Sequence, residues 1–350
     1  MRKWLVILTL LISSLSLRAE EVNVSEILFG HIGDSYGWHI TEWNGEHVII
    51  PLPCIVKSST GWHCFMSSKI EHGHEYEGLF IAHEGRYADK IVERGEDGEL
   101  IRPFDISITK NVASLMFSSA LLVLLVLLSA RWYRRHDAEN ETPSGLAAAL
   151  EPLVMMVNDE LIKENVGPDY KRYSPYLLTV FFFILLNNLL GIVPFFPGGA
   201  NVTGNIAVTM VLALCTFIAV NVFGNKHYWK DIFNTPGVPW WLKWGLPIMP
   251  IVEFVGMLTK PFVLCVRLFA NMTAGHIVIL GFITLIFIFG NMSIPLGYAV
   301  SPVSVLFSVF ISALECLVCF IQAYVFAMLS TLYIAMATEE HHEEHNIEKA

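Results

Sequence analysis

The chain has 350 residues, of which 54% are hydrophobic and only 15% are charged. A typical soluble domain carries about 25% charged residues, so this composition excludes an ordinary soluble enzyme and a disordered protein. Lys and Arg number 22 against 32 Asp and Glu. A net charge of −10 also excludes a nucleic-acid-binding surface, which needs clustered positive charge. Most of the chain is therefore expected to lie in a membrane.

Residues 1–19 have the features of a secretory signal peptide. Arg2 and Lys3 precede an apolar stretch that extends to Leu17, and Ala19 suits a cleavage site. Leu17 is larger than the residue usual at that distance from the cleavage site, so an uncleaved anchor helix is the alternative. We expect a signal peptide over 1–19.

Residues 20–104 are expected to form a small exported domain rich in strands. They contain 15 Asp and Glu, 6 Lys and Arg, and 7 of the 13 His residues. The short runs His47–Ile50 and Gly78–Ala82 predict strands, and Gly95–Gly98 predicts a hairpin turn. The shift in composition near residue 105 marks the end of this acidic domain.

Two features of the exported domain leave alternatives open. Cys54 and Cys64 can pair in an oxidising compartment, or both can remain free thiols. His72, His74 and Glu75 offer metal ligands, although solvated loop histidines are the more common outcome. We therefore expect no metal and no other cofactor in this chain.

Residues 105–338 are expected to form the membrane domain. Arg131, Arg134 and Arg135 follow the first apolar segment and predict that this end is cytoplasmic. The N-terminal domain would then be periplasmic, and the acidic tail 339–350 cytoplasmic, in a multi-pass protein of a bacterial inner membrane. Five segments are apolar enough to enter a membrane: Asn111–Ala130, Ser174–Val193, Asn205–Phe223, Pro247–Phe289 and Val303–Ala337.

The last two apolar segments are too long for upright membrane helices. As straight helices they would measure about 65 Å and 52 Å, against a hydrocarbon core of about 30 Å. We expect a steeply tilted helical hairpin with its turn in Asn291–Pro302 and a kink at Pro261. An amphipathic helix over 144–164 and the Trp-rich segment Lys226–Lys243 are expected at the inner membrane surface. The predicted fold is thus an all-α polytopic membrane protein with a small β-rich domain.

Ionisable residues inside apolar segments are expensive in a membrane, so they indicate function. Glu253, Lys260 and Arg267 are seven residues apart and share one stripe of a helix. His276 lies half a turn round from Arg267 and about 13.5 Å along the axis. Glu315 lies in the last segment, seven residues before Gln322 and on the same face.

These residue types suit different tasks. His276 and Glu315 can pass protons on, whereas Arg267 keeps its charge and can separate two proton-accessible regions. A purely structural alternative is that Arg267 forms a static ion pair with Glu253 or Glu315. Lys260 is more simply explained by a side chain that reaches the inner membrane surface.

Three sequence motifs resemble the F-type ATP synthase subunit a family. Val266–His276 reads VRLFANMTAGH and closely resembles that family's arginine signature. Gln322–Tyr324 resembles its last helix, and Asn187–Pro194, which reads NNLLGIVP, resembles the end of its second span. The resemblance covers about 105–342 and says little about 20–104.

The resemblance implies a proton-conducting stator subunit that is not itself catalytic. Its partners would be the rotating proteolipid c-ring, the peripheral-stalk b subunits, the rest of the ATP synthase complex and membrane lipid. Arg267 would separate two half-channels, with Asn271 and Gln322 around it. His276 and Glu315 match an ionisable pair whose order is exchanged in well-known bacterial members. Glu253 would belong to the inner half-channel.

Asn188 matches a polar position on the outer path, whereas Gly191 stands where some members of the family have Asp. A secondary cation transporter with a charged midplane site is the alternative function, although no inverted repeat is visible. A receptor built on the His-rich domain is a further alternative. The acidic domain is expected to help assembly or to concentrate cations rather than to transfer protons. Whether the ion is H⁺ or Na⁺ is left open.

Overall fold

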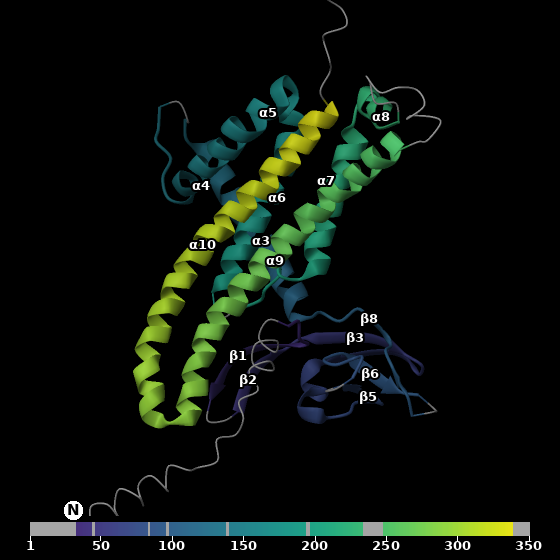
Figure 1. Cartoon of the computed structure of the whole chain (residues 1–350), viewed down its shortest axis with the longest axis vertical. Coiled ribbons are helices and arrows are strands. Elements are labelled where there is room, and N and C mark those ends of the chain that lie inside the picture. The colour runs from purple at the N-terminus through teal and green to yellow at the C-terminus, as the bar shows by residue number, and fades with distance from the viewer. Residues whose placement is uncertain are drawn as a thin grey trace, which may run out of the picture.

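The computed structural model describes residues 33–43, 46–82, 85–95, 98–137, 140–193, 197–233 and 248–338. The expected signal peptide, the tail 339–350 and most of the Trp-rich segment lie outside these residues. A small domain of strands sits against one end of a bundle of long helices (Figure 1). We call this the domain end of the bundle; there α6 ends, α7 begins and the long hairpin turns.

The small domain consists of short antiparallel sheets. The sheets have the strand orders β1-β2, β4-β3-β8 and β5-β6-β7. The predicted strands are confirmed in β2 and β5, and β6 and β7 pair across the predicted hairpin turn. The strands are β1 (Gly37–Trp43), β2 (Glu46–Pro51), β3 (Pro53–Ser58), β4 (Gly61–Met66), β5 (Leu79–Ile81), β6 (Ile91–Arg94), β7 (Leu100–Ile101) and β8 (Phe104–Asp105).

Apolar side chains from several of these strands form the core of the domain, among them Val56, Phe65, Leu79 and Ile91. Tyr36 lies at the edge of this core and donates a hydrogen bond to Asp105 Oδ2 over 2.5 Å. Burial, and then the Asp105 carboxylate, raise the pKa of the Tyr36 hydroxyl. The domain therefore has an apolar core of its own.

Cys54 and Cys64 do not pair. Cys54 lies opposite Phe65 in the β3–β4 ladder, and Cys64 lies opposite Ile55, so the two side chains point to opposite faces of the sheet. Cys54 is buried, Cys64 is exposed and both are free thiols. Burial raises the pKa of the Cys54 thiol to about 12, which makes it unreactive near neutral pH.

The described residues hold no group of three His, Cys, Asp or Glu side chains placed to bind a metal ion. The side chain of His72, one of the weak metal candidates, lies outside the described part of the domain. His63 instead contacts the Glu77 carboxylate from the neighbouring loop.

The helices confirm the five predicted apolar spans. Each predicted apolar segment lies within one of these candidate spans, apart from residues at its ends. The chain forms α3 (Lys110–Arg135), α4 (Leu146–Met155), the π-helical turn η3 (Met156–Lys163), α5 (Glu164–Val166), α6 (Tyr170–Ile192), α7 (Ile206–Phe223), α8 (Lys226–Phe233), α9 (Ile248–Met292) and α10 (Ile294–Thr338). The predicted amphipathic helix 144–164 corresponds to α4, η3 and the start of α5.

The long hairpin is longer and turns more sharply than the sequence indicates. Helices α9 and α10 each have 45 residues, about 67 Å at the usual rise. The turn lies at Ser293, inside the predicted segment Asn291–Pro302, but it is much shorter than that segment, because Pro302 lies inside α10. Proline is tolerated inside membrane helices, where neighbouring groups satisfy the freed carbonyl.

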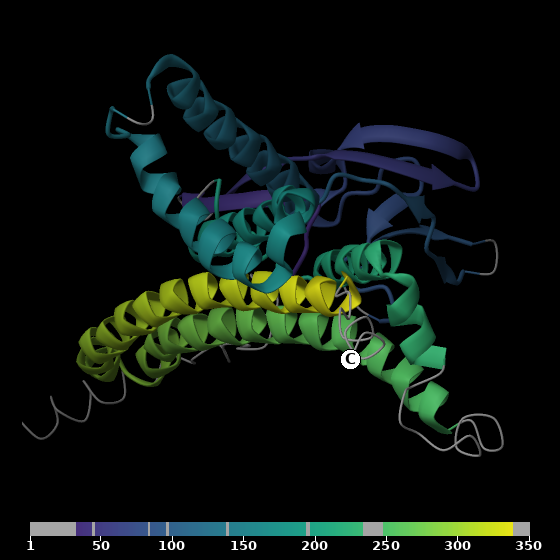
Figure 2. The same ribbon diagram turned by 90° about the horizontal axis from the view of Figure 1, so that it is seen from above.

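The helices form two layers. Figure 2 shows α9 and α10 side by side along one side of the molecule, with the remaining helices and the strands on the other side. Helices α6 and α7 pack against the hairpin, and their contact buries apolar side chains that include Phe181, Leu268 and Met272. This layer places the polar end of α6 against the middle of the hairpin.

Among the described residues, the small domain contacts the bundle through Trp38 and through the residues just before it. Trp38 of β1 packs against Ala200 and Val202, in the loop between α6 and α7. Asp34 Oδ1 accepts a hydrogen bond of 3.0 Å from the backbone N–H of Asn111, in the first turn of α3. The side chain of Thr109, which precedes α3, forms no such cap. The domain thus supplies the cap of the first membrane helix.

Candidate functional site

His276 of α9 and Glu315 of α10 lie next to each other between the two helices of the hairpin. His276 Nδ1 is 3.8 Å from Glu315 Oε1, and their side chains are 14% and 4% exposed. The distance is too long for a direct hydrogen bond but short enough for each charge to act on the other. His276 Nε2 and both Glu315 oxygens form no hydrogen bond within the described chain. The site therefore holds two titratable groups with unused hydrogen-bonding capacity.

Two glycines make this arrangement possible. A Cβ atom on Gly275 would lie 2.6 Å from Glu315 Oε1, so any larger residue displaces the carboxylate. A Cβ atom on Gly191 of α6 would lie 3.4 Å from His276 Nε2. The position at which some members of the family have Asp is thus directly beside the histidine.

Two amides join the hairpin to its surroundings. Asn188 is fully buried, and its Nδ2 donates to the Cys319 carbonyl of α10 over 3.3 Å. Gln322 is 4% exposed, and its Nε2 donates to the backbone carbonyl of Arg267 over 3.2 Å. The amide of Gln322 therefore ties α10 to α9 at the position of the arginine.

Arg267 and Asn271 are exposed on the surface of α9. Within the described residues, Arg267 forms no ion pair with Glu253, Glu315 or another carboxylate. The nearby side chains of Phe262 and Val266 are exposed too. The arginine thus lies on an apolar face that the described residues leave uncovered.

Glu253 and Lys260 lie further along α9, towards the end away from the domain. Glu253 is partly buried, and no pairing with Arg267 is found in the described chain. Lys260 Nζ lies 5.3 Å from the centroid of the Tyr333 ring of α10. This cation–π contact is typical of a lysine held at a helix surface.

The sequence analysis missed a set of buried polar residues on α3. Lys110, Asn111, Ser114 and Ser118 are all at most 7% exposed. Ser118 Oγ donates to Asn187 Oδ1 of α6 over 2.8 Å. The signal in the sequence was the helical spacing of these polar residues at the start of an apolar span. A search for charges inside the apolar segments does not find it, because Lys110 directly precedes the segment.

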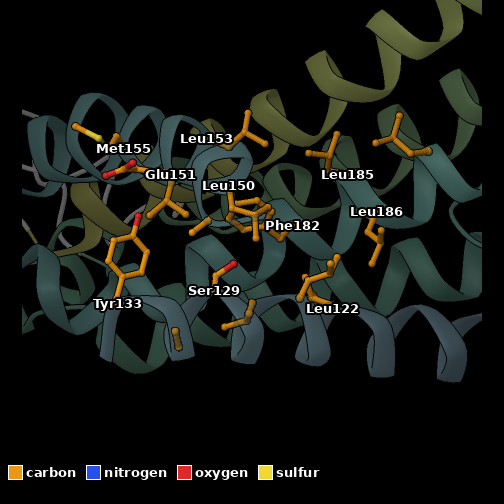
Figure 3. A pocket seen from close by; sticks show the side chains of 16 residues that line it. Leu122, Ser129, Tyr133, Leu150, Glu151, Leu153, Met155, Phe182, Leu185 and Leu186 are labelled. Atoms are coloured by element: carbon orange, nitrogen blue, oxygen red, sulfur yellow. The ribbon is translucent and has the colours of Figure 1, made fainter. Parts of the chain in front are cut away.

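A groove in the helix layer lies away from these residues. It has a volume of about 560 Å³ and is lined by apolar side chains of α3, α4 and α6 (Figure 3). Its polar lining consists of Ser129, Tyr133 and Glu151. None of the candidate proton-transfer residues lines it, so it is not the site.

Comparison with known proteins identifies the relatives of this arrangement. Residues 115–335 match the family model described as ATP synthase A chain, and residues 27–111 match a domain of unknown function. The chain is 42% identical to ATP synthase subunit a of Chloroherpeton thalassium over 250 residues, 70% of each chain. It is 42% identical to ATP synthase subunit a 2 of Prosthecochloris aestuarii over 302 residues, 82% of this chain and 87% of the relative.

A third relative is similar to this chain over the same region. ATP synthase subunit a of Myxococcus xanthus is 46% identical over 272 residues, which cover 75% of this chain and 84% of the relative. The matches include the whole arginine signature and both long helices. The chain therefore belongs to the F-type ATP synthase subunit a family, whose members are non-catalytic, proton-translocating subunits of the membrane sector.

Proposed function

We propose that this chain carries protons to and from a rotating proteolipid ring through two half-channels, and that Arg267 separates them. The observation that carries the proposal is the position of the titratable pair. His276 and Glu315 are buried together 3.8 Å apart, whereas Arg267 is exposed on the uncovered face of the same hairpin. Protons relayed by the pair would thus reach a partner that docks on the arginine face.

The remaining residues fit the same scheme. Asn188 and Gly191 adjoin the pair from α6 and would line the outer half-channel. Asn271 and Gln322 lie around Arg267, and Glu253 would serve the inner half-channel. The ring would lie against the tilted hairpin, and b subunits of the peripheral stalk would hold the stator in place.

The proposed orientation places the small domain in the periplasm and the C-terminal tail in the cytoplasm of a bacterial inner membrane. It is supported by Arg131, Arg134 and Arg135 at the end of α3 away from the domain, since basic residues concentrate on the cytoplasmic side. The outer half-channel then opens at the domain end of the bundle.

The experiment exchanges the two relay residues in the assembled complex. His276→Ala and Glu315→Gln are each expected to slow ATP-driven proton pumping, because each removes one titratable group from the path. The exchanged variant His276→Glu/Glu315→His should recover part of the activity, since the pair retains both group types. Losses that simply add, with no recovery on exchange, would show that the two residues are not a unit.

A further inference from the structure

Helix α3 buries polar residues and exposes apolar ones, the reverse of a helix in a soluble protein. Its buried residues are Lys110, Asn111, Ser114 and Ser118, which recur at helical spacing and share one face. Apolar residues on its other faces, such as Val123 and Leu127, are exposed. We call this face the polar file of α3.

The polar file leads to the site of the titratable pair. At its inner end, Ser118 Oγ donates to Asn187 Oδ1, and Asn187 is 2% exposed. The next residue, Asn188, is bonded to the carbonyl of Cys319. One helical turn further along α6, Gly191 lies beside His276. Buried polar side chains therefore recur from the start of α3 to Asn188, one helical turn from the glycine beside the histidine.

Several buried polar atoms near this route have no hydrogen-bond partner among the described residues. Asn111 Oδ1, Asn188 Oδ1 and Asn201 Nδ2 form no hydrogen bond within the described chain, and neither does His276 Nε2. The three asparagines are at most 6% exposed. An unsatisfied polar group costs several kcal/mol in hydrocarbon. Bound water removes this cost where polar partners surround it, so these atoms favour a hydrated route.

The small domain closes the other end of the file. Asp34 Oδ1 accepts from the Asn111 N–H, and the Ser35 carbonyl accepts from the Lys110 N–H over 2.8 Å. The Asp34 carboxylate also acts electrostatically on the buried Lys110 side chain. Asp34 thus offsets a cation that would otherwise repel protons at the mouth of the route.

We propose that Asp34 and the polar file of α3 form the outer inlet of the proton path to His276. The small domain is then part of the path rather than an accessory to assembly, and it thereby gains a function. This inference rests on the proposed function of the His276–Glu315 pair. It differs from a purely structural role, in which serines and asparagines only hold α3 against α6.

The first test asks whether water reaches the file. Ser118→Cys places a thiol on the file, and Ser119→Cys places one on the adjacent, partly exposed face at the same depth. In the parent complex, the six native cysteines of this chain are replaced. This parent is chosen because it still pumps protons. We expect Ag⁺ to inhibit proton pumping by Ser118→Cys several-fold more than by Ser119→Cys. A thiol on a dry interface does not ionise, so a dry file would make Ser118→Cys no more sensitive to Ag⁺ than Ser119→Cys. Equal inhibition of the two variants would therefore overturn the proposal.

The second test isolates the charge of Asp34. Asp34→Asn keeps an oxygen that caps Asn111 but removes the charge that offsets Lys110. We expect ATP synthesis driven by protons from the outer side to slow several-fold in Asp34→Asn. The double variant Asp34→Asn/Lys110→Met should recover most of it, because it removes the cation together with the anion. An Asp34→Asn complex with unchanged synthesis, or a double variant as slow as the single one, would contradict the inlet.

The two proposals fail in different ways. If His276→Ala and Glu315→Gln leave proton pumping intact, the proposed function itself is wrong. In a second case those variants lose pumping, but Ser118→Cys responds to Ag⁺ like Ser119→Cys and Asp34→Asn synthesises ATP at an unchanged rate. Then only the inlet is wrong, and protons reach His276 by another route.

Discussion

At the scale of single residues, the site depends on how closely two helices approach. Glu315 reaches His276 only because Gly275 presents no side chain to the carboxylate. Gly275 directly precedes the histidine in the stretch that resembles the family signature, and the structure gives it a steric reason. The hairpin brings one histidine and one carboxylate together.

Gly275→Ala tests this steric account. The added methyl group would lie 2.6 Å from Glu315 Oε1, so the carboxylate must move away from its present position. We expect the complex to assemble and its ATP-driven proton pumping to fall by roughly tenfold or more. Gly281→Ala is the matched control, because nothing lies within 4 Å of its added methyl group. Equal pumping by both variants would show that the position of Glu315 does not matter.

At the scale of helices, the sequence predicts that a helix exists more reliably than it predicts where that helix begins and ends. The apolar length of each segment sufficed to predict all five spans, since hydrocarbon tolerates few charges. The turn of the hairpin was predicted too long, because Gly and Pro indicate a turn in water but persist inside membrane helices. The contact between His276 and Glu315 was inferred from a family resemblance, because spacing along one helix cannot set its register against another.

The polar file of α3 was missed for a different reason. Serine and asparagine cost less than a charge in an apolar segment, so they attract little notice in a search for ionisable residues. Their significance appears only when burial is known, since Ser114 and Ser118 are each 1% exposed. Contacts with the small domain could not be predicted at all, because nothing in 20–104 links it to the charges of the membrane domain.

Gly297→Ala tests how the hairpin closes at its tip. A Cβ atom on Gly297 would lie 2.8 Å from the Gly290 Cα, which is backbone and cannot turn aside. We expect this overpacking to destabilise the chain by about 1–3 kcal/mol, measured as a lower unfolding midpoint of the subunit in detergent. Gly290→Ala, whose methyl group meets nothing within 4 Å, is the control. A Gly297→Ala midpoint equal to that of the control would mean that the tip is looser than the structure has it.

At the scale of the whole molecule, a domain of strands covers one end of a membrane bundle (Figure 1). The acidic composition of residues 20–104 predicted a separate folded unit, and the buried cluster around Val56 and Leu79 is its core. The family match that begins at residue 115 leaves this unit outside the matched part of the chain. Its contacts with Asn111 and Ala200 join it to the sector nonetheless.

Thiol labelling tests the orientation of the chain. Cys64 is exposed on β4, whereas Cys54 is buried and its thiol has a raised pKa. We expect a membrane-impermeant maleimide to label the chain in spheroplasts, whose outer face is accessible, and Cys64→Ser to abolish most of this label. Labelling of Cys64 in inside-out vesicles but not in spheroplasts would place the domain in the cytoplasm.

The central claim is that Arg267 separates two proton-accessible regions, and ATP synthesis by an Arg267→Ala complex tests it most directly. Assembly of the complex is checked first. We expect it to be normal, because the Arg267 side chain is exposed and forms no ion pair within the described residues. We predict that proton-driven ATP synthesis is abolished, and that Arg267→Lys does not restore it fully, since lysine is a compact cation that can lose its proton. Normal synthesis by an assembled Arg267→Ala complex would contradict the account.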